Sequence, residues 1–217
     1  MLRFFTLVAV LAALCAGGRA RADDEFSSAR HYPALAMKWD AVQSRMEQEA
    51  AHLVLCRAEP ETCRPEEKRF ATILDTAREQ EGRARLGHIN RAVNLAVRPI
   101  SDLQRFGVVD HWSAPMETLQ AGGGDCEDYA ILKFMVLREA GFSDTDLKLL
   151  IVRSPGSPTA HAVLAARNDG EWLVLDNRGF ALVRLNDSPY RMLTQFSIEP
   201  AVTLVASAGG SDLPPLL

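Results

Sequence analysis

The chain has 217 residues, and its 24 Lys and Arg against 28 Asp and Glu give a formal net charge of −4 at pH 7. This length suits one well-buried domain, and the composition is that of an ordinary globular protein without low-complexity tracts or solenoid repeats. The acidic balance, without a basic stripe, argues against nucleic acid as a partner.

Residues 1–22 have the pattern of a secretory signal peptide. Arg3 precedes the apolar stretch 4–16, and residues 20–22 (Ala-Arg-Ala) match a small-x-small cleavage site. The apolar stretch is too short for a stable membrane span, although retention as an uncleaved anchor stays open. We therefore expect an exported protein that is not an integral membrane protein after processing, with a flexible lead-in over residues 23–32.

Residues 33–141 are predicted to form a mainly helical part. Up to Arg98, apolar side chains recur three and four positions apart in three successive runs, and Pro99 ends the third run. The connection over residues 102–120 is expected to be rich in loops. A further helix is predicted to begin at Cys126 and to stop at Gly141.

After Gly141 the apolar period changes to two, which predicts antiparallel strands in a part that extends over residues 147–207. The expected strands are 147–152, 161–167, 172–176 and 181–185, and Asn168-Asp169-Gly170 is a hairpin signal. Residues 208–217 are rich in Gly and Pro and are expected to fray. Helices first and strands afterwards predict an α+β fold, as a single domain over residues 33–207.

Three cysteines remain once Cys15 has left with the signal peptide. Cys56 and Cys63 enclose a short loop, and export favours a local disulfide between them; two separate buried thiols are the alternative. In the chain-entropy model, a disulfide that closes this loop stabilises the folded state by roughly 2.5 kcal/mol. Cys126 is then an odd cysteine, which indicates a reactive thiol or an intermolecular bridge.

Cys126 follows three glycines, Gly122-Gly123-Gly124, and Asp125, directly before an apolar-periodic run. The glycines allow a sharp turn, which places the cysteine in the first turn of a helix, where unpaired N–H groups and the macrodipole favour a thiolate. The sequence therefore predicts a cysteine nucleophile.

His161 and Asp176 are the candidate partners of that nucleophile. If Asn168-Asp169 forms the hairpin turn, His161 lies opposite Asp176; if Asp169-Gly170 forms it, Asp176 opposes Val163, a diagonal neighbour of His161. In both registers the two side chains share a face. An aspartate there accepts a hydrogen bond from one imidazole nitrogen and leaves the other nitrogen free for a thiol.

Asp125 and Glu127 flank the cysteine, and two interpretations of them stay open. As helix caps, Asp125 would occupy the N-cap and Glu127 the first turn. However, carboxylates beside a thiol oppose its ionisation, and a bound hard cation would reverse that effect. With backbone carbonyls and water, the two acids offer the oxygen ligands that Ca²⁺ takes. Trp112 is expected to pack in the core, or alternatively to line a cleft and donate its indole N–H to an oxyanion.

Five segments of the chain resemble the bacterial transglutaminase-like cysteine proteinases, whose best-studied members are LapG-type periplasmic proteases. The resemblance runs from about Cys56 to Ile198. Its segments are Asn90-x-x-Val93-Asn94, Asp110-x-Trp112-x-x-Pro115-x-Glu117, Gly122-x-Gly124-Asp125-Cys126-Glu127-Asp128-Tyr129-Ala130, Ala160-His161-x-Val163-Leu164 and Val174-Leu175-Asp176-Asn177.

The resemblance implies a papain-like, transglutaminase-type core, in which N-terminal helices pack on an antiparallel sheet. It implies Cys126 as nucleophile, His161 as base and Asp176 as the residue that orients it, and Ca²⁺ dependence through Asp125 and Glu127. The cysteine pair at 56 and 63 also looks like the family's pair.

The resemblance further implies a periplasmic endopeptidase that cuts a large surface adhesin near its N-terminal retention module and so promotes biofilm dispersal. An inner-membrane cyclic-di-GMP receptor that sequesters the protease is the implied partner. Two segments depart from the family pattern: residues 97–102 lack the tyrosine usual before this aspartate, and residues 193–198 lack the expected tyrosine and asparagine. Competing interpretations are acyl transfer to an amine, as in transglutaminases, and a non-enzymatic, calcium-stabilised binding protein with a vestigial site.

Overall fold

The computed structural model describes residues 32–197. The predicted signal peptide, nearly all of the predicted lead-in and the predicted frayed tail lie outside the described residues. Within residues 32–197, no helix combines the length and the apolar character that crossing a membrane requires.

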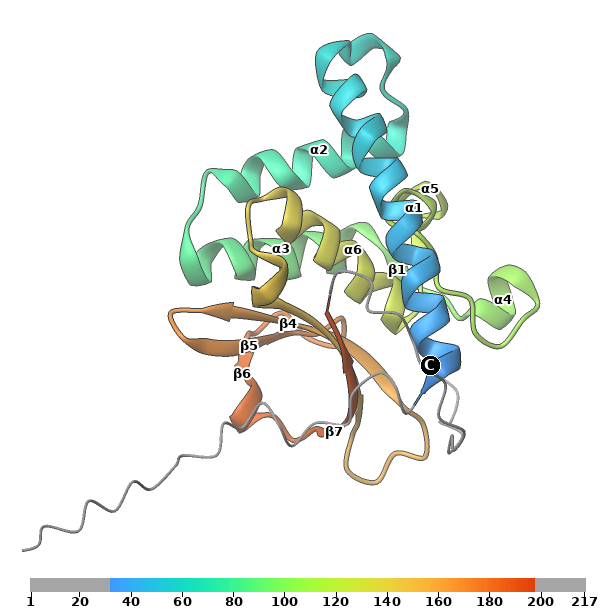
Figure 1. The fold of residues 1–217 in the computed structure, drawn as a ribbon, viewed down its shortest axis with the longest axis vertical. Coiled ribbons are helices and arrows are strands. Elements are labelled where there is room, and N and C mark those ends of the chain that lie inside the picture. The colour runs from blue at the N-terminus through green and yellow to red at the C-terminus, as the bar shows by residue number, and fades with distance from the viewer. Residues whose placement is uncertain (1–31, 198–217) are drawn as a thin grey trace, which may run out of the picture.

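Helices form the first part of the chain and lie over one face of a sheet formed by the second part (Figure 1). This arrangement confirms the predicted α+β order. The helices are α1 (Pro33–Ala58), α2 (Pro65–Arg78), α3 (Gly82–Ala96), α4 (Asp102–Phe106), α5 (Pro115–Ala121) and α6 (Cys126–Glu139), with short 3-10 turns at η3 (Pro60–Thr62), η4 (Asp144–Asp146) and η5 (Leu185–Asp187).

The segment 102–120 contains two short helices, α4 and α5, where the sequence predicted a loop-rich connection. Each ends at a glycine in the left-handed region, Gly107 with φ 70° and Gly122 with φ 60°. Pro115 occupies the first turn of α5, a position that suits proline. Both helices are too short to show an apolar period, so their sequence signals are these end residues.

The sheet has five strands in the order β6-β5-β4-β3-β7, and all neighbours are antiparallel. The strands are β3 (Leu147–Arg153), β4 (His161–Asn168), β5 (Glu171–Leu175), β6 (Val183–Arg184) and β7 (Arg191–Phe196). A separate parallel pair, β1 (Arg98–Pro99) and β2 (Gly123–Gly124), lies before α6.

The end of the sheet differs from its prediction in two ways. The expected strand 181–185 shortens to the two residues of β6, because Leu182 packs on the main core and its carbonyl accepts from Arg83 Nη2 at 2.9 Å. β7 was not expected, and it pairs with β3 at the sheet edge with a register shift between Ile151 and Val152. Buried Thr194 interrupts the apolar alternation of β7, which explains why no strand is visible in the sequence.

The β4–β5 hairpin has Asp169-Gly170 as its turn, because Asn168 pairs with Glu171. Asp169 and Gly170 have φ values of 51° and 80°, as the favoured two-residue hairpin turn requires. The second of the two predicted registers is therefore present, and the first is wrong.

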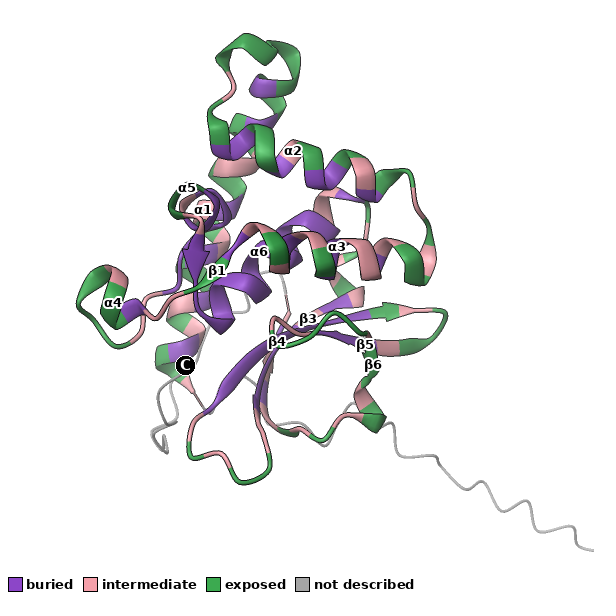
Figure 2. Ribbon diagram, turned by 180° about the vertical axis from the view of Figure 1, so that it is seen from behind, coloured by how far each residue is buried: buried purple, intermediate pink, exposed green. Residues whose placement is uncertain are grey.

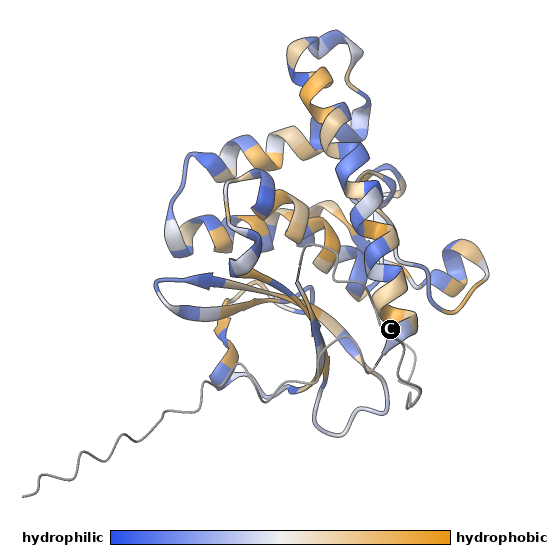
Figure 3. Cartoon of the chain, in the orientation of Figure 1, coloured by the Kyte–Doolittle hydropathy of each residue, from blue (hydrophilic) through white to orange (hydrophobic). Residues whose placement is uncertain are grey.

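Helix α6 is the centre of the core, and every residue from Cys126 to Leu137 is buried (Figure 2). It contacts α2 and α3 on one side and β4 on the other, and hydrophobic residues concentrate on it and on the strands beneath it (Figure 3). Its burial on all sides explains why its sequence is apolar almost throughout. The far face of the sheet carries a smaller cluster made of Leu150, Val152, Val163, Ala165 and Val174.

The predicted disulfide is present between Cys56, in the last turn of α1, and Cys63, directly after η3. It closes the projecting end of α1 onto the start of α2. Cys126 is the free cysteine of the described residues, and it is buried.

Candidate active site

Cys126 is the first residue of α6, as predicted, and the N-terminus of this helix meets the start of β4. The contact is direct, because the Ala162 N–H donates a hydrogen bond to Cys126 Sγ. The start of β4 is available because β5 ends at Leu175, which pairs with Leu164. Residues 161–163 thus have no partner strand on that side, and the helix end lies there instead.

His161 and Asp176 are in contact, as the hairpin geometry predicted. His161 Nε2 lies 2.9 Å from Asp176 Oδ1. The Tyr190 hydroxyl donates to Asp176 Oδ2, and the Arg178 backbone N–H donates to Oδ1 at 3.0 Å. Burial opposes ionisation of Asp176, but the hydrogen bonds and charge of His161 and these further donors outweigh it and hold its pKa well below the usual range.

His161 shares a sheet face with Val152, its direct partner on β3, and so lies on the side of the smaller cluster. The body of α6 packs on the opposite face, against residues such as Ala162 and Leu164. The cysteine and the histidine therefore approach each other around the end of β4, not across one face of the sheet. The hairpin register alone could not indicate this arrangement.

The thiol and the imidazole are not hydrogen-bonded to each other in this structure. Cys126 Sγ donates to Glu127 Oε2 at 3.3 Å, while His161 Nδ1 is buried without a partner among the described residues. Both side chains are 1 % exposed. His161 Nδ1 is thus the ring nitrogen that remains free to accept a hydrogen bond.

Burial raises the pKa of Cys126 well above its usual range, and the charges of Glu127 and Asp125 raise it further. The hydrogen bond from the Ala162 N–H acts in the opposite direction but is smaller. The electrostatic conflict that the sequence indicated is therefore present in the folded protein.

The carboxylates beside Cys126 belong to a larger acidic cluster of Asp102, Asp110, Asp125, Glu127 and Asp128. One ligand atom from each of Asp102, Asp110 and Glu127 lies within 4.8 Å of the others, and the same holds for Asp102, Asp125 and Asp128. One carboxylate oxygen is buried without a partner in each of Asp102, Asp110, Asp125 and Glu127. Asp125 occupies the N-cap position of α6, yet its side chain makes no capping hydrogen bond.

This cluster fits a hard divalent cation. Buried polar atoms are almost always paired, and the unpartnered oxygens of four neighbouring acids match the oxygen ligands that such a cation takes. Burial raises the pKa of Asp102 to about 6 and that of Asp128 to about 7, and the charge of Asp125 adds to both shifts. A bound cation offsets this repulsion, whereas helix capping does not explain it.

A sequence model of the family described as bacterial transglutaminase-like cysteine proteinase matches residues 42–207. The chain belongs to this family. It is a transglutaminase-like cysteine protease, and the expected family is confirmed. A search of curated proteins finds no match.

Solved structures of LapG from Legionella pneumophila have a similar fold. The calcium-bound form is 24% identical with a TM-score of 0.58, over 75% of this chain and 92% of that one. A second LapG structure is 24% identical with a TM-score of 0.55, over 66% and 82% of the two chains. An EGTA-treated form is 24% identical with a TM-score of 0.54, over 64% and 78%.

Three residues near the site of this cysteine proteinase were not predicted as functional. Asp110 belongs to a family-like segment without an assigned role, and Asp102 is the last residue of the segment 97–102 that departs from the family pattern. Both reach the cluster because α4 folds back: the His111 N–H donates to Asp102, and Lys38 Nζ lies 2.6 Å from Asp110 Oδ2. Tyr190 lies fourteen positions after Asp176, and only the position of β7 brings them together.

The glycines before Cys126 differ in what they provide. Gly122 ends α5 in the left-handed region, whereas Gly124 makes room for Asp128, because a Cβ on it would lie 2.5 Å from Asp128 Oδ2. Asp128 in turn accepts from the Ser113 N–H at 2.8 Å and from Arg105 Nη1 at 2.9 Å. Gly124 thus allows the buried Asp128 to join α6 to the α4–α5 segment.

Gly124→Ala is expected to destabilise the proteinase by about 1–3 kcal/mol, because the new methyl group overlaps Asp128. Gly179→Ala is the matched control, since a Cβ there meets nothing within 4 Å. Thermal melts of both variants measure the difference. Equal melting temperatures for the two variants would contradict this account of Gly124.

Trp112 is buried and packs edge-on against Phe196, with 6.1 Å between ring centroids, as the core-packing interpretation predicted. Its indole Nε1 has no hydrogen-bond partner among the described residues.

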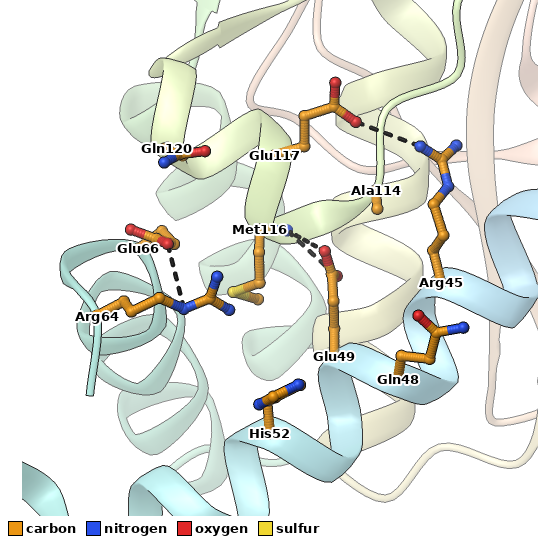
Figure 4. A pocket seen from close by; sticks show the side chains of 10 residues that line it. All are labelled: Arg45, Gln48, Glu49, His52, Arg64, Glu66, Ala114, Met116, Glu117 and Gln120. Atoms are coloured by element: carbon orange, nitrogen blue, oxygen red, sulfur yellow. Dashed lines mark hydrogen bonds and ion pairs between the residues drawn. The ribbon is translucent and has the colours of Figure 1, made fainter. Parts of the chain in front are cut away.

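A cavity of about 330 Å³ lies between α1, α2 and α5 (Figure 4), and Cys126 is not among the residues that line it. Its charged side chains are largely paired with each other: Arg45 with Glu117 at 3.3 Å, and Arg64 with Glu66 at 3.4 Å. Glu49 accepts from the Met116 N–H at 3.1 Å, and Figure 4 shows its carboxylate pointing at that backbone. Side chains that line the cavity therefore join α5 to α1, and none of the candidate catalytic residues is among them.

Glu49 is expected to make stability depend on pH. Burial raises its pKa from 4.5 to about 7, against the hydrogen bond from Met116. A carboxyl group whose pKa is higher in the folded state stabilises the folded protein at pH values below its unfolded-state pKa. This contribution to the free energy of unfolding is lost as the pH rises through about 7.

Between about pH 5 and pH 7.5, the free energy of unfolding of the Glu49→Gln variant should therefore fall less than that of the wild type. Denaturant unfolding at the two pH values measures the change. Glu47→Gln, at an exposed neighbour on α1, is the control and should behave as the wild type. An identical pH dependence in all three proteins would refute the role of Glu49.

Proposed function

We propose that Cys126, His161 and Asp176 are the catalytic residues of this cysteine protease. The observation that carries the proposal is the 2.9 Å contact between His161 Nε2 and Asp176 Oδ1, next to a helix that begins at a free cysteine. The contact fixes the imidazole with Nε2–H toward the carboxylate and leaves Nδ1 as a proton acceptor.

In the proposed mechanism, Cys126 Sγ attacks the scissile carbonyl carbon while its proton passes to His161 Nδ1. The N–H groups in the first turn of α6 have no intrahelical partners and stabilise the oxyanion that forms. His161 then gives the proton to the leaving amine, which leaves a thioester on Cys126. Water, deprotonated by His161, hydrolyses the thioester and restores the thiol. Asp176 stabilises the imidazolium at each stage.

We further propose that the acidic cluster holds Ca²⁺, with Asp125 and Glu127 as ligands and Asp102 and Asp110 as additional ones. Four buried carboxylate oxygens without partners support this proposal, and so does the existence of calcium-bound and EGTA-treated LapG structures with a similar fold. Ca²⁺ held by these residues would supply positive charge beside the thiol, which would favour the thiolate. Glu127 Oε2 accepts the hydrogen bond from the Cys126 thiol, so Glu127 connects the acidic cluster to the proposed nucleophile.

The proposed substrate is a large surface adhesin, cut near its N-terminal retention module to release it and promote biofilm dispersal. The proposed location is the periplasm, and the proposed partner is an inner-membrane cyclic-di-GMP receptor that sequesters the protease. Support for these three statements comes from the family-like segments around Cys126, His161 and Asp176 and from the apolar pattern of residues 1–22.

Mass spectrometry of surface and released proteins from wild-type and Cys126→Ala cells tests this function. We expect an adhesin that lacks its N-terminal region in the medium of wild-type cells and stays intact on cells of the variant. Identical fragments in both strains would exclude adhesin processing by this protease.

A further inference from the structure

Asn90 and Asn94 on α3 belong to a family-like segment of the sequence to which the proposed mechanism gives no role. They are one helical turn apart, so their side chains lie on the same face of the helix. Asparagine favours helix caps and turns over helix interiors, and Asn90 is fully buried. A specific interaction is therefore expected at both positions.

Both asparagines donate hydrogen bonds to the backbone of the segment that follows β5. Asn94 Nδ2 lies 2.9 Å from the Asp176 carbonyl oxygen and 3.0 Å from that of Gly179. Asn90 Nδ2 lies 3.0 Å from the Gly179 carbonyl oxygen and 3.3 Å from that of Phe180. Because carbonyl oxygens only accept hydrogen bonds, each amide must present its nitrogen to the segment. The two side chains thus hold residues 176–180 against α3.

Strand pairing and core packing do not fix the backbone of residues 176–180. β5 ends at Leu175, so its pairing with β4 stops one residue before Asp176. None of residues 176–180 belongs to either hydrophobic core cluster, and residues 178–180 are exposed. A Cβ on Gly179 would meet nothing within 4 Å. The hydrogen bonds from α3 therefore position this segment more than packing does.

The same backbone carries the carboxylate that contacts the His161 ring. Asp176 Oδ1 lies 2.9 Å from His161 Nε2, while the Asp176 carbonyl oxygen accepts from Asn94. Helix α3 also packs beside α6, whose first residue is Cys126 (Figure 1). Helix α3 therefore relates the position of Asp176, and through it that of His161, to the helix that carries the free cysteine.

We propose that Asn94 is a positioning residue for the reaction: it holds the backbone of Asp176 so that the carboxylate keeps His161 in the Nε2–H tautomer. Asn90 supports this role by holding the far end of the segment. The tautomer matters because the mechanism needs Nδ1 unprotonated to accept the thiol proton. This inference rests on the proposed roles of His161 and Asp176, but it does not depend on any substrate or on bound calcium.

NMR of protein labelled with ¹⁵N-histidine, in the Cys126→Ala background, tests the proposal without requiring activity. The sequence has five histidines, so the ring signals are few. At alkaline pH, where the ring is neutral, the nitrogen shifts show which ring nitrogen carries the proton. Asn94→Leu keeps the size of the side chain but removes the donor. It should move the ratio of the His161 tautomers about threefold or more toward Nδ1–H, as the loss of one hydrogen bond predicts.

Asp176→Asn provides the reference, because its amide can donate to the ring and so removes control of the tautomer. Because Asn94 acts through Asp176, the double variant Asn94→Leu/Asp176→Asn should have the same tautomer ratio as Asp176→Asn alone. Leu86→Ala is the matched control, since Leu86 is a buried apolar residue of the same helix. It should lower the melting temperature but leave the tautomer ratio unchanged.

An unchanged tautomer ratio in Asn94→Leu would overturn the proposal. So would additive shifts in the double variant, or an equal shift in Leu86→Ala, which would indicate only a general loss of stability. If Asn94→Leu does not fold, Asn94→Ser replaces it, because serine offers a single donor where the amide offers two. Failure of the protease assignment would instead appear as proteolysis that survives in Cys126→Ala, and it would leave the tautomer ratios as they are.

Discussion

Replacing Cys126 with alanine is expected to reduce proteolysis by a factor of at least about 10⁴, because the thioester can no longer form. His161→Ala should cause a loss of the same order, since it removes both the proposed base and the group that returns a proton to the leaving amine. Asp176→Asn should retain more activity than either, because it loses only control of the tautomer and stabilisation of the imidazolium. Cleavage of the proposed adhesin substrate by the purified proteins measures all three effects.

Thermal melts provide the control for this series. Removing one sulfur atom from the buried site at Cys126 leaves a small cavity, so Cys126→Ala should melt close to the wild type. Asp176→Asn should melt lower, because His161, Tyr190 and Arg178 all donate to its carboxylate. Wild-type activity in folded Cys126→Ala protein would end the assignment of Cys126 as nucleophile.

Calcium is expected to raise the melting temperature of the protein, and its removal by a chelator to suppress cleavage. A ligand that binds only the folded state stabilises it by mass action, by about 2.7 kcal/mol at a free concentration one hundred times the dissociation constant. Mg²⁺ should restore less activity, because it demands a regular octahedral site. Calorimetry and chelator titrations measure both effects.

Variants of the acidic cluster locate the site. Asp125→Ala and Glu127→Ala should each lose the calcium-dependent shift, and Asp102→Ala should do the same, because Asp102 belongs to both groups of ligand atoms. Asp144→Ala, in the 3-10 turn before β3, is the control and should keep the full shift. If calorimetry finds no calcium binding and cleavage survives the chelator, a different explanation is needed for the unpartnered oxygens.

The parts of the site that are local in sequence could be predicted. The position of Cys126 at a helix start follows from the change from glycines to an apolar run, and the contact of His161 with Asp176 follows from one hairpin and its period of two. Both inferences depend on neighbouring residues whose geometry the backbone fixes. The fold class likewise follows from the change of apolar period near Gly141.

The rest depends on contacts between distant segments. Asp102 and Asp110 join the cluster only because α4 folds back towards the start of α6, and no local pattern encodes that path. Lys133 looks like a polar residue within an amphipathic helix until α6 is seen to be covered on all sides. Tyr190 reaches Asp176 through β7, a strand whose alternation is interrupted by a buried threonine.

The enclosed, protonated state of Cys126 has a consequence for the lifetime of the enzyme. Disulfide interchange and oxidation by peroxide both proceed through an accessible thiolate. A third sulfur in an oxidising compartment would otherwise attack the Cys56–Cys63 bridge, scramble the pairing and dimerise the chain. Because the thiol is covered and its ionisation is opposed by neighbouring carboxylates, the proposed nucleophile is expected to react slowly with peroxide and with disulfides. The acids that oppose ionisation of the thiol are thus also expected to protect it from oxidation and disulfide exchange.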